Sequence, residues 1–343
     1  MFPRSLVGRV ALWTMCVCVA TYAAGCGARP EESAGPRVDP DFATGPEVSE
    51  FTVMAWNIWH GGNDEQLNED GRPHVIDIIR NSGADIVLMV ETYGIGQMLS
   101  EALGFNYHLI AEPGTAPDDP DINLSIHSRF PFGQRIDFYR YFNSGGIEIE
   151  LSPTQRIVVF DTWFSYEPWV DEPEKLGKSP AELVEWERSG TRPEQVTAIL
   201  DGMRPWVDNA GEVPVIMAGD HNVESHLDWT EEARGLNGGL VVPWWTSSAI
   251  AERGFVDTYR LINPSPVTHR GITWDMRDKP DEARIDFVYW LGDKIRPIRS
   301  EIYMARWNDS FEINGQTSMY PSDHGFVLTR FEWVGEGESA GER

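Results

Sequence analysis

Acidic and amide side chains recur at the ends of apolar segments along this chain of 343 residues. In the segment VIMAGDHNVE, an apolar run stops at one glycine, and Asp220, His221 and Asn222 follow it. A buried strand cannot keep an unpaired carboxylate in the core, so Asp220 belongs just past a strand end, where loops carry chemistry. Taken alone, such a residue is typical of a turn or a helix cap.

The same placement occurs at four other points: Asn57 after FTVMAW, Glu91 after DIVLMV, Asp286 within RIDFVYW, and Asp323 with His324 before GFVLTRF. This repetition favours one shared site over five unrelated turns. Carboxylate and amide oxygens are the ligands that hard cations prefer. If these groups converge, the sequence predicts a site for Mg²⁺ or Mn²⁺.

The elements that must position these residues mix strands and helices. Helices are predicted at 72–83, where Gly83 is a stop signal, at 94–104, and at 192–207, where Pro193 lies in the first turn. Apolar and alternating runs predict the strands. They are FTVMAW, DIVLMVE, NYHLIAE, INLSIHS, RIDFYRYF, GIEIEL, RIVVFDTWF, VPVIMAGD, GITWDMR, ARIDFVYW, IRSEIYMA and HGFVLTRFEWV. Groups of strands with interspersed helices indicate two packed sheets covered by helices.

Composition limits the classes of partner. The chain is 41% hydrophobic, and its formal net charge is −26. Such an acidic surface repels phosphate backbones, which argues against tight non-specific binding of nucleic acid. A nuclease is not excluded, because a bound divalent cation can reverse the sign of the field inside a site. We expect one domain over 51–334 and a disordered tail over 335–343.

The N-terminus predicts export. Residues 1–25 combine basic residues, an apolar run and small residues before Cys26, as a signal peptide does. The ending resembles the lipobox of bacterial lipoproteins, which implies a lipid anchor at Cys26; a plain secretory signal and an uncleaved anchor are the alternatives. Residues 26–50 are rich in Pro, Gly and acid and predict a disordered tether. We therefore expect a cell-envelope lipoprotein or a secreted protein, monomeric, with membrane contact only through the anchor.

The order of motifs resembles a known family. The motifs AWNIWHGG, VLMVET, IHSRFP, RPEQ, GDHN, GFVDTYR, ITW, RIDFV and SDHGFV are similar to successive signatures of the endonuclease/exonuclease/phosphatase superfamily, across about residues 50–332. This superfamily includes DNase-I-like nucleases, apurinic endonucleases, neutral sphingomyelinases and inositol-polyphosphate phosphatases. The resemblance implies an α/β fold, a four-layer α-β-β-α sandwich of two mostly antiparallel sheets with the site at one end.

The resemblance also implies the metal ligands. Glu91 would be the principal ligand, assisted by Asn57 and Asp323. A phosphodiester is anionic and repels hydroxide, so a metal must neutralise charge while a water is aligned with the leaving oxygen.

The catalytic roles carried over by the resemblance fall on five residues. Asp220 would orient the attacking water or stabilise the transition state, and Asn222 would contact the scissile phosphate. Asp323 would orient His324, which would act as a general base or stabilise the developing charge. Asp286 would hold this group from behind.

Two positions depart from the family pattern. The family usually reads N-T-H-L where this chain has DTWF, so Trp163 replaces a histidine near the leaving group and cannot shuttle a proton. Tyr166 and His127 are the candidate substitutes. Some nucleases carry an Asp where this chain has Trp59, which His60 follows; His60 either contacts substrate or has a packing role.

Two long acidic segments, 165–190 and 226–248, carry several tryptophans. Either they are solvated loops with anchoring aromatics, or they form a rim that stacks on a sugar, a base or a lipid head group. We expect a metal-dependent hydrolase of a small or lipid-linked phosphodiester or phosphomonoester. A DNA or RNA endonuclease is the first alternative, and a non-catalytic scaffold, motivated by Trp163, is the second.

Overall fold

The computed structural model describes residues 46–169, 172–277 and 283–334. The predicted signal peptide, Cys26, all but the last five residues of the tether, and the tail lie outside these residues. In the part of the chain that is described, no helix combines the length and the apolar character needed to cross a bilayer.

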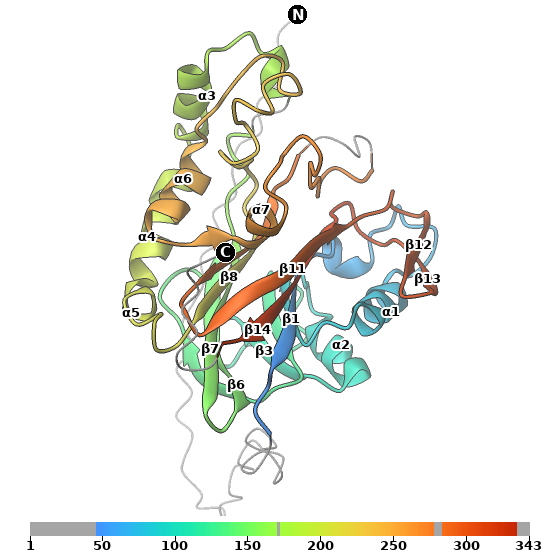
Figure 1. Ribbon diagram of the computed structural model, residues 1–343. Helices are drawn as coiled ribbons and strands as arrows, with labels where there is room; N and C mark the ends of the chain where they lie inside the picture. The colour runs from blue at the N-terminus through green and yellow to red at the C-terminus, as the bar shows by residue number, and fades with distance from the viewer. Residues whose placement is uncertain (1–45, 170–171, 278–282, 335–343) are drawn as a thin grey trace, which may run out of the picture. The chain divides into compact units, whose positions relative to one another are not determined.

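Two six-stranded sheets form the centre of the described chain (Figure 1). The first has the order β11-β14-β1-β2-β4-β3. Its strands are β1 (Glu50–Asn57), β2 (Ile86–Val90), β3 (Asn106–Ile110), β4 (Leu124–Ser128), β11 (Ile295–Tyr303) and β14 (Phe326–Trp333). The second has the order β5-β6-β7-β8-β10-β9. Its strands are β5 (Phe132–Ile136), β6 (Ser144–Ser152), β7 (Gln155–Trp163), β8 (Val215–Asp220), β9 (Val256–Asp257) and β10 (Asp286–Leu291). A separate hairpin pairs β12 (Ser310–Ile313) with β13 (Gln316–Met319).

Each sheet contains a parallel pair among antiparallel neighbours. These pairs are β1 with β2 and β7 with β8. The carboxyl ends of parallel strands meet at one edge of a sheet, so residues that follow them become neighbours. Asn57 is the last residue of β1 and pairs with the residue before Glu91, and Trp163 pairs in register with Asp220. The two parallel pairs therefore bring four of the predicted site residues to strand ends.

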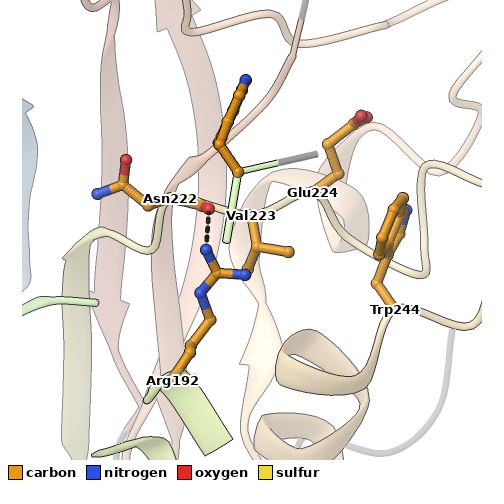
Figure 2. A pocket seen from close by; sticks show the side chains of 6 residues that line it. Arg192, Asn222, Val223, Glu224 and Trp244 are labelled. Carbon is orange, nitrogen blue, oxygen red and sulfur yellow. Dashed lines mark hydrogen bonds between the residues drawn. The ribbon is translucent and has the colours of Figure 1, made fainter. Parts of the chain in front are cut away.

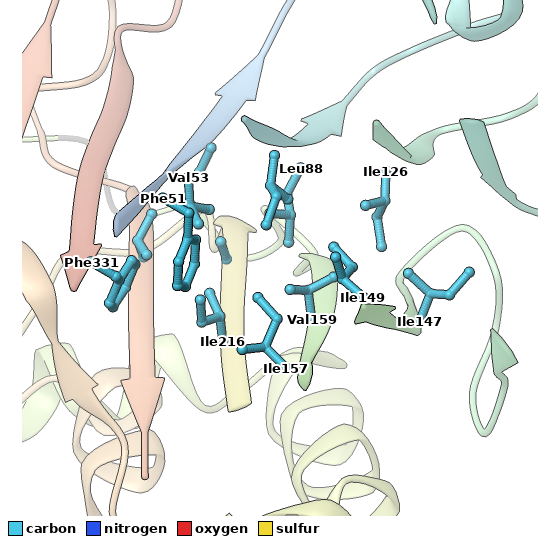
Figure 3. Close-up of a cluster of buried hydrophobic side chains, with 14 of the residues drawn as sticks. Phe51, Val53, Leu88, Ile126, Ile147, Ile149, Ile157, Val159, Ile216 and Phe331 are labelled. Atoms are coloured by element: carbon cyan, nitrogen blue, oxygen red, sulfur yellow. The ribbon is translucent and has the colours of Figure 1, made fainter. Parts of the chain in front are cut away.

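Alternation along the strands builds three apolar layers. One face of each sheet packs against the other sheet; Figure 3 shows this layer, to which Val53, Leu88, Val159 and Ile216 contribute. The opposite face of the first sheet packs on α1 (Arg72–Ser82) and α2 (Gly96–Leu103). The opposite face of the second sheet packs on α4 (Arg192–Gly202), α5 (Arg204–Val207) and α6 (Trp245–Glu252). The expected four-layer sandwich is confirmed.

One predicted strand was wrong, and another was too long. GITWDMR is irregular apart from one isolated bridge between Trp274 and Ala283. The backbone amides of Thr273 and Trp274 both donate to the Ala283 carbonyl, so the alternating ladder of a strand cannot continue. RIDFYRYF forms a strand only as far as Ile136, the end of β5.

The acidic segments 165–190 and 226–248 are more than solvated loops. They contribute to a separate apolar cluster: Leu183, Val223, Trp229, Val242 and Trp244. The first segment contains η3 (Pro173–Lys175) and α3 (Pro180–Glu187), whose start is fixed by a Ser179–Glu182 capping box. Buried Glu187 then accepts the first backbone amides of α6, from Trp245 at 2.6 Å and Thr246 at 2.9 Å. The two segments are therefore tied to each other and to the second sheet's helical layer.

Candidate functional site

The predicted polar residues meet where the two parallel pairs end. The amide nitrogen Nδ2 of Asn57 lies 3.1 Å from Glu91 Oε1 and 3.2 Å from Asp220 Oδ2. It is also 3.4 Å from Nε2 of His324. The side-chain amide of Asn57 thus contacts His324, which lies 267 positions later in the sequence. The first sheet contributes Asn57 and Glu91, and the second contributes Asp220.

A second set of contacts completes the cluster. Asp220, Asp286 and His324 each offer one atom that could bind a metal ion. These three atoms lie within 4.8 Å of one another, and all three residues are buried. Nδ1 of His324 is 2.9 Å from Oδ2 of Asp286, and Nε2 is 4.0 Å from Oδ2 of Asp220. Asp286 starts β10 and pairs in register with Asp220, which ends β8. The antiparallel register therefore positions the two carboxylates.

One predicted relationship was wrong. Asp323 was expected to orient His324, but its Oδ1 is 3.9 Å from Nε2 and makes no hydrogen bond to the ring. Asp286, which was predicted to support the group from behind, holds Nδ1 instead. Oδ2 of Asp323 faces Nε of Arg277 at 3.4 Å, which explains why it is turned away from Nδ1.

The cluster fits a hard divalent cation. Both carboxylate oxygens of Asp323 are buried without a hydrogen bond from any described residue. Buried carboxylates of this kind are costly unless a cation or a donor satisfies them. Glu91 adds two oxygens at the same edge, held by Asn57 and by the backbone amide of His60 at 2.9 Å. The oxygen-rich donor set is the one that Mg²⁺ and Mn²⁺ prefer.

Burial and mutual charge shift the pKa values here. Burial raises the pKa of Asp220 to about 7; His324 opposes this shift and Asp286 adds to it. Burial likewise raises the pKa of Asp323 to about 6. For His324, burial favours the neutral ring, but the carboxylates of Asp286, Asp323 and Asp220 outweigh it and raise its pKa well above the ordinary value. An imidazolium next to carboxylates that titrate near neutrality is suited to proton transfer.

Gly219 explains why the apolar run of β8 ends as it does. Its φ is 140°, and a Cβ at this position would lie 1.9 Å from the Thr162 carbonyl oxygen. Only glycine permits this approach of β8 to β7. The next residues form a closed turn, in which the Asn222 backbone amide donates to Asp220 Oδ1 at 2.9 Å and its side-chain amide donates to Oδ2 at 3.0 Å. The Asp220 carboxylate is thereby fixed in orientation.

Arg192, which begins α4, was not among the predicted site residues. Its buried guanidinium donates to the Asn222 carbonyl at 2.9 Å and to the Ser165 carbonyl at 2.7 Å. Figure 2 shows the first of these bonds beside a small pocket that Glu224 and Trp244 also line. The motif RPEQ was the available signal: its arginine fixes the loop after β8, and its glutamine accepts the Ser165 amide at 2.8 Å.

Arg277 was also missed. Its guanidinium lies 4.4 Å from the centre of the Trp59 ring and 3.4 Å from Asp323. No motif marks this arginine, because its place at the site depends on the irregular chain around Trp274.

His127 was proposed as a substitute for the missing histidine, and this proposal was wrong. Its ring is fully buried in β4, with Nδ1 2.7 Å from Ser100 Oγ and Nε2 2.8 Å from Ser125 Oγ. Burial lowers its pKa to about 3, so the ring is neutral. It pairs with Val87, three residues before the end of β2, and is therefore a core residue.

The other three predicted contact residues lie nearer the surface. Trp163 ends β7 beside Asp220, and the Tyr166 ring is 6.2 Å from the Trp163 ring. His60 is exposed, stacks on Trp59 at 4.2 Å, and places Nδ1 2.7 Å from Asp64 Oδ2. All three therefore present polar or aromatic groups at the strand ends that carry the cluster.

Comparison with known proteins identifies the fold and the family. An uncharacterized protein of Caenorhabditis elegans is 27% identical over 304 residues, which cover 82% of this chain and 91% of that protein. The human Nocturnin catalytic domain with bound sulfate anion matches with a TM-score of 0.53 and 15% identity, over 83% of this chain and 94% of its own. The structure of D. rerio TDP2 complexed with single strand DNA product matches with a TM-score of 0.51 and 16% identity, over 83% of this chain and 100% of its own. These two structures share the fold. The model of the Endonuclease/Exonuclease/phosphatase family matches residues 54–324, and the chain belongs to this family.

Proposed function

We propose that this protein is a divalent-metal-dependent phosphoester hydrolase. The observation that carries the proposal is the buried cluster of Asp220, Asp286 and His324 beside the Asn57–Glu91 pair. Membership of the family supports it, since the family's name covers nucleases and phosphatases.

The chain's own groups divide the work of hydrolysis. Glu91 and Asp323, with Asn57, would hold the cation, which when bound neutralises the phosphate charge and lowers the pKa of a water. Asp220, fixed by Asn222, orients the attacking water and accepts its proton as the water oxygen bonds to phosphorus. The P–O bond to the leaving group breaks, and the leaving oxygen keeps the electron pair and takes a proton from solvent. His324, charged and held by Asp286, stabilises the negative charge that builds on the phosphoryl oxygens.

Charge favours a small or lipid-linked substrate. A net charge of −26 repels a polyanion over its whole length but a single phosphate only locally. One observation favours the alternative of a DNA or RNA endonuclease: TDP2, which shares the fold, was solved with a single strand DNA product. The sulfate anion in the Nocturnin structure supports a tetrahedral anion as ligand for this fold without distinguishing the two.

A substrate panel tests the proposal. The purified full chain is assayed with Mg²⁺, Mn²⁺ or EDTA on bis-p-nitrophenyl phosphate, p-nitrophenyl phosphate, sphingomyelin liposomes and plasmid DNA. Metal-dependent hydrolysis of a small or lipid-linked ester that EDTA abolishes is the expected result. Nicking of plasmid alone would favour the endonuclease, and no turnover with any metal would favour a non-catalytic scaffold.

We further propose that the protein is exported and anchored through lipid at Cys26. The signal-like composition of residues 1–25 supports this proposal. Incorporation of radiolabelled palmitate in a bacterial host, abolished in Cys26→Ser, is the expected result. Equal labelling of both proteins would contradict it.

A further inference from the structure

Three aromatic side chains stand together at the strand end next to Asp220. We call Phe142, Trp163 and Tyr166 the aromatic shelf. The Trp163 ring lies 5.3 Å from the Phe142 ring at 86° and 6.2 Å from the Tyr166 ring at 71°. Phe142 and Tyr166 are 43% and 52% exposed, which is high for large apolar rings. Exposed aromatic groups that gather at one place mark a binding surface more often than scattered ones do.

Hydrogen bonds fix the shelf to the candidate site. The carbonyl of Phe142 accepts Nδ2 of Asn123 at 2.8 Å, and Oδ1 of Asn123 accepts the backbone amide of Glu91 at 3.2 Å. Trp163 pairs in register with Asp220 across the parallel strands. Phe142 is thus linked to Glu91 through Asn123, and Trp163 to Asp220 through the strand pairing.

Two further tryptophans lie near the His324 ring. The Trp274 ring is 6.4 Å from the His324 ring and 4.9 Å from the Trp169 ring. In the order β7-β8-β10, Trp163 of the shelf ends β7, while Trp274 bridges to Ala283 just before β10. Asp220, at the end of β8, therefore has Trp163 on the neighbouring strand β7 and lies next to β10, which Trp274 precedes.

The charge of the protein restricts what these surfaces receive. The shelf carries no charge, and the chain's −26 disfavours a dianion more than a monoanion. We propose that the substrate is a monoanionic phosphodiester in which a flat ring, stacked on the aromatic shelf, is bonded to the scissile phosphate. This inference rests on the proposed function and narrows its substrate class from phosphoesters in general to diesters with a ring substituent.

Binding of inert analogues tests the inference separately from catalysis. Diphenylphosphinate and dimethylphosphinate are both monoanions and contain no ester bond, so they differ only in the rings. Isothermal titration calorimetry on the full chain with Mg²⁺ should give a dissociation constant at least about tenfold lower for diphenylphosphinate, because ring stacking adds to the phosphinate contacts. Phenylphosphonate, largely a dianion at pH 8, should bind more weakly than diphenylphosphinate.

The double variant Phe142→Ser/Tyr166→Ser should lose most of the preference for the diphenyl compound and keep its thermal midpoint. Leu261→Ser is the matched control, since it removes a side chain that is 49% exposed on α7 (Thr258–Ile262) and outside the shelf. The proposal that a substrate ring stacks on the aromatic shelf would be overturned by equal affinity of the wild-type chain for the two phosphinates. An unchanged preference in the double variant would also overturn it. If the wild-type chain hydrolyses nothing in the substrate panel, the proposed function is overturned, but the result of this binding experiment still stands.

Discussion

Oδ2 of Asp286 lies 2.9 Å from Nδ1 of His324, and both residues are buried. This contact leaves Nε2 of the ring directed toward Asp220 and Asn57. The pairing fixes the ring orientation and stabilises its positive charge. Asp323, which precedes His324 in the sequence, does not hold the ring and is available to bind a cation.

Asp286→Asn should lower kcat by about a hundredfold, because it removes the carboxylate that orients His324 and stabilises its charge. Loss of the carboxylate also removes a cause of the raised His324 pKa, so the imidazolium is lost at lower pH. The alkaline limb of the pH–rate profile should therefore move to lower pH. The half-saturating Mg²⁺ concentration should stay within about twofold of wild type; a large change in metal requirement would place Asp286 among the metal ligands.

Asp220→Ala and His324→Ala should each reduce turnover by at least about a hundredfold. His221→Gln is the control, because His221 follows Asp220 directly but packs against the rings of Phe164 and Tyr289. It should lower stability while kcat per folded molecule stays near wild type. Turnover near wild type in both alanine variants would contradict the assignment of the site.

Gly219→Ala should destabilise the protein by about 1–3 kcal/mol and reduce activity, because the new methyl group meets the Thr162 carbonyl and forces β8 away from β7. Gly211→Ala is the matched control, since a Cβ there meets no atom within 4 Å. Urea unfolding of the two variants gives the comparison. Similar unfolding free energies for both would show that the close approach at Gly219 is not needed.

The strand ends could be predicted from the sequence because each apolar run stops at a polar residue. Asn57, Glu91 and Asp220 come together because parallel pairing aligns the ends of β1, β2, β7 and β8. The partner of His324 could not be predicted in this way. Adjacency in the sequence favoured Asp323, whereas the register of β10 against β8 decides in favour of Asp286.

Residues that act through irregular backbone escaped prediction for a related reason. Arg277 reaches Asp323 from a segment whose amides share one carbonyl acceptor, a geometry that hydrophobic pattern does not encode. His127 illustrates the opposite error. Its polarity suggested chemistry, but two serine hydroxyls satisfy both ring nitrogens inside the sheet layer.

Two buried histidines should make the fold sensitive to acid. Burial lowers the pKa of His127 and of His221 to about 3, while the unfolded chain protonates them near 6.5. Below pH 6.5 the unfolded state binds more protons than the folded state, so the stability present at neutral pH is lost as pH falls. Each histidine should lower the free energy of unfolding by about 2 kcal/mol between pH 7 and pH 5. The unfolding free energy of His127→Asn should therefore fall by about 2 kcal/mol less than that of wild type over this interval; an equal fall would mean that His127 is protonated in the folded state.

Asp323→Asn should make the protein more stable than wild type without metal and less stable than wild type with metal. Without metal, burial of the Asp323 carboxylate outweighs its attraction to His324 and Arg277, and Glu91 repels it. The neutral amide should therefore raise the free energy of unfolding by about 1 kcal/mol at pH 8. With Mg²⁺, the wild-type chain should gain stability as the logarithm of metal concentration, and the variant should gain much less because it has lost a ligand. Differential scanning calorimetry in EDTA and in increasing Mg²⁺ follows both effects. Asp64→Asn is the control, since Asp64 pairs with exposed His60 and should give parallel curves. A variant that is less stable than wild type in EDTA, yet gains as much from Mg²⁺, would show that Asp323 has a structural role and does not bind the cation.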